Sequence, residues 1–116
     1  MQNIDNLSVI EQQAFNLAQA GIGLDQSRMD GAEPGALAHA LEHNLQTWVE
    51  LSVVIRSPEC FLAEQIRDNL LKLAEFVSGV TFEHGIDIPE SAINTLVNID
   101  FQISEGLLEG AGKKKP

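Results

Sequence analysis

Hydrophobic positions recur at helical spacing in one long central segment, residues 35–56. They follow one another at alternating steps of four and three residues, which places them on one face of a helix. The positions are Leu37, Leu41, Asn44, Trp48, Leu51 and Ile55. One of them, Asn44, is polar, and a buried amide needs hydrogen-bond partners. The segment predicts an amphipathic helix around which the rest of the chain is organised.

Two later segments share this periodicity and follow typical helix start signals. A serine, a proline and an acid at 57–59 predict a helix that begins there and ends by about Glu83. An aspartate, a proline and a glutamate within 87–90 predict the start of a last helix. The apolar stripe of that helix contains a carboxylate, Asp100. Burying a carboxylate is costly unless it is hydrogen-bonded or paired.

The N-terminal part of the chain has a weaker pattern. Ser8 and Glu11 have the spacing of a capping box, and the helix that they start has a narrow apolar stripe. Gly21 is a typical helix end. Residues 21–33 hold three glycines and no periodicity, which indicates a flexible connector.

These segments predict an all-α fold, a small single-domain bundle of three main helices plus a weaker N-terminal helix. Residues 1–33 hold the N-terminal helix and the flexible connector, residues 34–110 the helical domain, and residues 111–116 a disordered basic tail. The 116 residues suit one domain. The chain has only five Phe, one Trp and no Tyr, whereas strands favour aromatic and β-branched residues.

The charge of the chain limits its partners. There are 17 acidic and 7 basic residues, a formal net charge of -10, and three of the basic residues are lysines at 113–115. Such a surface repels phosphate groups, which disfavours direct binding to nucleic acid or to anionic lipid. No apolar run approaches the length of a membrane span, and the N-terminus lacks the pattern of a signal peptide. We therefore expect a cytoplasmic protein without a membrane partner.

One short motif resembles a catalytic site. His39, Glu42 and His43 form H-x-x-E-H, the order of zinc ligands and general base in inverzincin peptidases. On the predicted helix these side chains point away from the apolar stripe, and the short chain offers no obvious third ligand. The motif is therefore interpreted as a solvated polar face. We predict a protein that is not an enzyme and has no catalytic residues, no metal and no other cofactor.

Three stretches in order form a longer signature. They are Ala40, Leu41, Asn44, Trp48 and Leu51; then Leu62, Ile66, Arg67, Leu70, Leu73, Ala74, Phe76 and Val77; and then Ile99, Asp100, Ile103, Gly106 and Leu107. This pattern, over about 36–108, resembles the FlaF family, small helical proteins of alphaproteobacteria. The family favours asparagine at the position of Asp100, and the first 30 or so residues show no convincing match.

The resemblance implies a flagellum-biogenesis protein that binds flagellin and regulates its synthesis or export, as a regulator or chaperone working alongside FlbT. The residues that it marks as partner-binding, or as parts of the core, are Asn44, Trp48, Leu51, Asp100, Ile103, Gly106 and Leu107. Stripes on the second and last helices are expected to form a groove, with Trp48 as an aromatic anchor. Two alternatives stay open: a homo-oligomeric adaptor, such as a homodimer, with another protein client, and a direct mRNA-binding regulator, which the charge disfavours.

The polar residues of the two apolar stripes suggest a specific contact. Asn44 and Asp100 each interrupt an otherwise apolar helix face. We predict that they lie close together, each satisfying the other or the indole N–H of Trp48. Arg67 is the alternative partner for Asp100.

Overall fold

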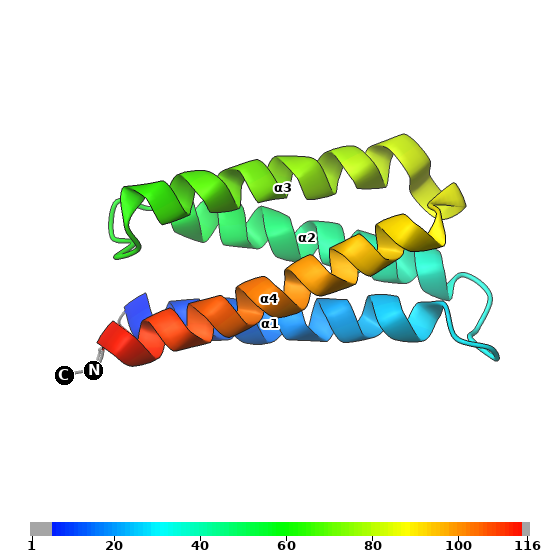
Figure 1. The fold of residues 1–116 in the computed structure, drawn as a ribbon, viewed down its shortest axis with the longest axis horizontal. Helices are drawn as coiled ribbons and strands as arrows, with labels where there is room; N and C mark the ends of the chain where they lie inside the picture. The colour runs from blue at the N-terminus through cyan, green and yellow to red at the C-terminus, as the bar shows by residue number, and fades with distance from the viewer. Residues whose placement is uncertain (1–5, 115–116) are drawn as a thin grey trace.

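The protein is a bundle of four α-helices, seen in a computed structural model that describes the backbone of residues 6–114 and the side chains of residues 9–109 (Figure 1). The helices are α1 (Asn6–Ser27), α2 (Ala36–Arg56), α3 (Glu64–His84) and α4 (Glu90–Lys114), with a 3-10 turn, η1 (Gly85–Asp87), between the last two. No strand occurs among residues 6–114. The all-α prediction is confirmed, and α2 has almost the predicted bounds.

The helices are not packed equally. α1 and α4 run antiparallel and share the most extensive contact, α2 packs against α1, and α3 packs against α2 (Figure 1). No comparable backbone approach joins α3 to α4 among the described residues. The bundle measures 46 × 24 × 20 Å. One side, between α3 and α4, is thus closed only by side chains.

The N-terminal helix is a central element, and the prediction that it is weaker was wrong. Leu17 and Ala14 are fully buried in the core, and α1 continues through Gly21 to Ser27. A Cβ atom at Gly21 would lie 3.1 Å from the ring of Phe101 on α4. The small residues that made this helix look thin in the sequence let α4 approach closely, so that the pair buries much apolar surface.

The start of α3 also differs from the prediction. Ser57 accepts hydrogen bonds at its backbone oxygen from the N–H of Cys60 (3.0 Å) and at its hydroxyl from the N–H of Glu59 (3.2 Å). These bonds close a tight turn, so the helix begins only at Glu64. Leu62 therefore lies ahead of the helix. At the other end of the chain, α4 extends to Lys114, into the stretch predicted as a tail.

Candidate functional site

A buried polar cluster joins α2 to α4 at the centre of the molecule. The indole Nε1 of Trp48 donates a hydrogen bond to Oδ1 of Asp100 at 2.9 Å. The amide of Asn44, oriented with its nitrogen toward the carboxylate, donates to Oδ2 at 2.6 Å and to Oδ1 at 3.2 Å. The predicted contact between Asn44 and Asp100 is confirmed. Arg67 is not needed as their partner, and its buried Nε has no hydrogen bond within the described part of the chain.

The environment of Asp100 changes its acidity. Its side chain is 0% exposed, as is that of Asn44. Burial raises the pKa of Asp100 from 3.8 to about 7, while the hydrogen bond from Trp48 lowers it. Desolvation penalises the ionised form more than this donor compensates for it. The cluster is therefore a buried, titratable hydrogen-bond network.

Most of the predicted site residues form the core and do not contact solvent. Asn44, Trp48, Leu51, Asp100 and Leu107 are all 5% exposed or less. Trp48 cannot act as an anchor for a partner while its indole is bonded inside the bundle. The expected groove between the second and last helices is therefore absent at these residues, because their side chains fill that space.

A groove does occur on the neighbouring side, between α3 and α4. It has a volume of about 230 Å³ and an almost entirely apolar lining: Leu62, Ile66, Leu70, Ile103, Gly106 and Leu107. The predicted residues Ile103, Gly106 and Leu107 thus meet here. Leu62, Ile66 and Leu70, which belong to the signature but were not predicted as site residues, form the other wall. Ile66 is 47% exposed.

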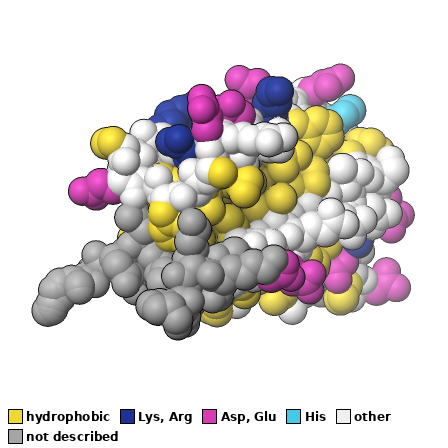
Figure 2. Space-filling view, turned by 60° about the vertical axis from the view of Figure 1, so that its left-hand side comes forward, with side chains coloured by type: hydrophobic (Ala, Val, Ile, Leu, Met, Phe, Trp, Pro, Cys, Tyr) yellow, Lys and Arg dark blue, Asp and Glu magenta, His cyan; other side chains and the backbone are white. Residues whose placement is uncertain are grey.

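The surface around this groove is amphipathic. Figure 2 shows hydrophobic side chains gathered in a band across the face in view, with acidic side chains around its edges and fewer basic ones, most of them near the top. Phe76 on α3, 46% exposed, is a further apolar side chain that the fold leaves uncovered. Contiguous apolar surface with a polar rim is typical of interaction sites.

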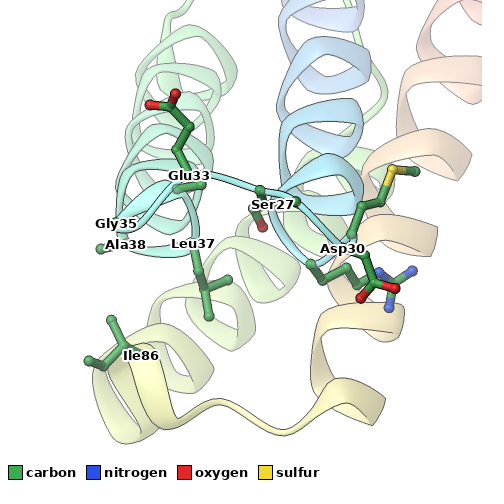
Figure 3. Close-up of a pocket in the computed structure, with 12 residues that line it drawn as sticks. Ser27, Asp30, Glu33, Gly35, Leu37, Ala38 and Ile86 are labelled. Carbon is green, nitrogen blue, oxygen red and sulfur yellow. The ribbon is translucent and has the colours of Figure 1, made fainter.

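A second hollow lies at the connection from α1 to α2. It has a volume of about 510 Å³ and is lined by residues 27–33, by the start of α2 and by Ile86. Figure 3 shows Asp30 and Glu33 on opposite sides of this hollow, so that their carboxylates do not converge on a common point. Backbone and small side chains form most of the remaining wall. The arrangement indicates a solvated loop.

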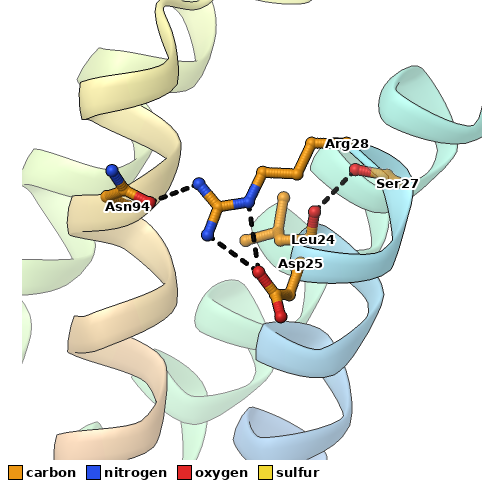
Figure 4. A network of polar contacts seen from close by, with 5 residues as sticks. All are labelled: Leu24, Asp25, Ser27, Arg28 and Asn94. Carbon is orange, nitrogen blue, oxygen red and sulfur yellow. Dashed lines mark hydrogen bonds and ion pairs between the residues drawn. The ribbon is translucent and has the colours of Figure 1, made fainter. Parts of the chain in front are cut away.

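The end of α1 next to this loop is tied to α4. Arg28 donates to Oδ1 of Asp25 through Nε at 3.1 Å and through Nη2 at 2.8 Å, and through Nη1 to Oδ1 of Asn94 (Figure 4). The hydroxyl of Ser27 donates to the backbone oxygen of Leu24 at 2.7 Å. These bonds end α1 and orient its last turn. Because they are partly exposed, we assign them a positioning role.

The H-x-x-E-H motif lies on the solvent side of α2, as predicted. His39, Glu42 and His43 are all exposed. Within residues 9–109, no three His, Cys, Asp or Glu side chains are grouped so as to hold a metal ion. A catalytic zinc site needs three protein ligands, and the described surroundings of this motif supply two.

None of the helices in the described part of the chain combines the length and the apolar character that crossing a membrane requires.

Comparison with known proteins identifies a family. A family model described as flagellar protein FlaF matches residues 2–107. No curated protein and no solved structure gives a significant match. The resemblance predicted for residues 36–108 is therefore confirmed. The match also includes α1, so the expectation that the first 30 or so residues lack a match was wrong. This wider match agrees with the central place of that helix in the bundle.

Proposed function

This chain belongs to the FlaF family of flagellar proteins, and from that premise we propose that it binds flagellin and regulates its synthesis or export in the cytoplasm. The observation that carries the proposal is the family match over residues 2–107. The description of that family names a flagellar protein and no catalytic activity. The proposed action is therefore that of a binding protein, a regulator or chaperone for flagellin.

The apolar groove between α3 and α4 supports a binding role. A helical client can bury an amphipathic face in such a groove, a recurring mode of peptide recognition. Part of the groove wall is left uncovered by the fold, as at Ile66, which is 47% exposed. FlbT is proposed as a further partner, on the grounds of the family resemblance.

Regulation through protein contacts is favoured over direct contact with mRNA. The net charge of -10 repels the phosphate backbone. A regulator of this charge acts on translation by capturing the newly made protein or another regulator. The alphaproteobacterial setting is likewise proposed from the family resemblance.

The direct experiment measures binding of purified flagellin to this protein by isothermal titration calorimetry. We expect saturable binding of monomeric flagellin, and no gel shift of the flagellin leader RNA at physiological salt. An acidic helical protein of similar size and charge serves as the control. Absence of any heat of binding at micromolar concentrations, together with a specific RNA shift, would replace this proposal with the mRNA-binding alternative.

A homo-oligomeric adaptor is the second candidate, favoured by apolar residues on the outer side of the α1–α4 pair. Phe15 and Ile22 on α1 are 58% and 40% exposed, and Phe101 and Leu108 on α4 are 39% and 48% exposed. Exposed apolar residues of this kind often bury against a second copy. Light scattering after gel filtration tests it. A monomeric mass at about 100 µM protein would exclude the homo-oligomer.

A further inference from the structure

We propose that the groove between α3 and α4 is the docking site for a single amphipathic α-helix of a partner protein, one whose apolar stripe is flanked by lysine or arginine. The inference rests on the proposed function, since flagellin is the protein proposed to supply such a helix. It adds the location of the site and the chemistry of its occupant.

The shape of the groove suits a helix. α3 packs against α2 and α4 packs against α1, so no helix of the described residues covers the side between α3 and α4. The groove is lined on α3 by Ile66 and Leu70 and on α4 by Ile103, Gly106 and Leu107, about one helical turn of each, so it would hold a short stretch of a partner helix. The hollow of about 230 Å³ is smaller than a typical small-molecule site. It accommodates one or two large apolar side chains projecting from such a helix.

Gly106 gives a second reason to expect a partner helix to approach α4 closely at this groove. A glycine inside a helix costs about 1 kcal/mol relative to alanine. At Gly21 the packing of Phe101 explains the glycine, because a Cβ atom there would be crowded. At Gly106 a Cβ atom would meet no atom of the described residues within 4 Å, apart from its chain neighbours and the nearby backbone of its own helix, and the residue lines the groove. Packing among the described residues does not require this glycine. Its absent side chain leaves space for the backbone of a partner.

The charge of this half of the molecule identifies the occupant. Nine acidic side chains between residues 59 and 109 are exposed: Glu59, Glu64, Asp68, Glu75, Glu83, Asp87, Glu90, Glu105 and Glu109. The same range holds two basic residues, Arg67 and Lys72, and three further lysines follow at 113–115, so acidic residues still outnumber basic ones from residue 59 onward. A second copy of this chain would bring the same acidic surface and would be repelled. A helix with lysine or arginine beside its apolar stripe is complementary in charge.

Three synthetic 18-residue helical peptides test the proposal with the full-length protein. The first has leucines at helical spacing and lysines elsewhere, the second replaces the lysines with glutamates, and the third contains the lysines with the leucine positions scrambled. Binding is measured by fluorescence anisotropy of labelled peptide at physiological salt. We expect the first peptide to bind at least tenfold more tightly than the other two. Equal binding of the first and the scrambled peptide would overturn the proposal, because charge alone would then explain it.

The variant Gly106→Leu places a side chain into the groove and should weaken binding of the first peptide at least tenfold. The matched control is Gly79→Leu, the same change at another exposed helical glycine with open space around it, outside the groove. This control should bind as the wild type does. Ile66→Gln, at the exposed wall of the groove, is the second blocking variant, and circular dichroism verifies that each protein is folded. Wild-type affinity in both groove variants would overturn the site.

Flagellin then separates this inference from the proposed function. Flagellin that binds the wild type and Gly106→Leu equally would overturn the groove as its site and leave the proposed function in place. If binding of the basic amphipathic peptide depends on Gly106 while flagellin does not bind at all, the groove is supported as a docking site and flagellin is refuted as its client.

Discussion

Replacing Asp100 with asparagine tests the physical account of the buried cluster. The carboxyl group is 0% exposed and accepts hydrogen bonds from Trp48 and Asn44. Asparagine at this position keeps an oxygen for the indole N–H of Trp48. Its NH₂ group can donate to the oxygen of Asn44 once the amide of Asn44 turns over. The substitution therefore preserves the shape and the hydrogen bonds of the cluster while removing its titration.

The expected effect depends on pH. Burial raises the pKa of Asp100 from 3.8 to about 7, so between these values the folded state binds more protons than the unfolded state. The stability that the neutral carboxyl contributes is fully present below about pH 4 and is lost as the pH rises through about 7. The whole shift corresponds to about 4 kcal/mol, of which about 2 to 3 kcal/mol is lost between about pH 5 and pH 8.5.

The measurement is urea unfolding, followed by circular dichroism, of the wild type and of Asp100→Asn at about pH 5 and pH 8.5. The free energy of unfolding of the variant, relative to the wild type, should rise by about 2 to 3 kcal/mol from the lower to the higher pH. Asp68→Asn, at an exposed position of α3, makes the same change of charge and is the control. If Asp100→Asn and Asp68→Asn show the same pH dependence, Asp100 does not titrate as a buried acid.

Four further substitutions test the packing of the bundle. Trp48→Phe removes the N–H donor and should lower the free energy of unfolding in urea by about 1.5 to 3 kcal/mol. Because that hydrogen bond lowers the pKa of Asp100, the loss of stability with rising pH should extend to higher pH in this variant. An unchanged pH profile would contradict this reasoning. Gly23→Ala should raise the thermal midpoint by the equivalent of about 1 kcal/mol, because its new Cβ meets no described neighbour within 4 Å. Gly21→Ala should give no such gain, because its Cβ meets atoms of α4 at 3.1 to 3.2 Å. Equal gains would show that α4 can shift away at no cost in stability. Ser104→Ala removes a buried hydrogen bond of 2.6 Å to a backbone carbonyl of α1 and should cost about 0.5 to 1.5 kcal/mol in the same urea assay, so a neutral result would mean that this bond adds no net stability.

Several features of the fold were predictable from local pattern. The period of the apolar residues placed α2 within one residue of its observed start, because an amphipathic stripe reports directly on which face is buried. The two polar interruptions at Asn44 and Asp100 predicted a contact between helices, because buried polar groups need partners. The exposed position of the H-x-x-E-H motif followed from the same geometry.

Local pattern failed where a hydrogen bond or a distant helix decided the outcome. Ser57 was predicted to cap a helix, but its hydroxyl and backbone oxygens accept hydrogen bonds that close a tight turn instead. The same side-chain oxygen can form either structure. The N-terminal helix looked weak because alanine and glycine contribute little hydrophobicity. These small residues stabilise the helix by letting α4 pack closely against it, and this contact is visible only in the assembled bundle.

The sequence alone therefore determined the helical class, the central amphipathic helix, the acidic surface and the pairing of Asn44 with Asp100, because each follows from periodicity, charge or the need of a buried polar group for a partner. Only the tertiary structure decided which apolar residues remain uncovered. Ile103 and Gly106 belong to the same signature as Leu51, yet they are partly exposed and line a groove, while Leu51 is fully buried. The difference arises because, among the described residues, α3 packs chiefly against α2 and makes no comparable backbone contact with α4, and the sequence of a single helix does not specify which of its neighbours will cover it.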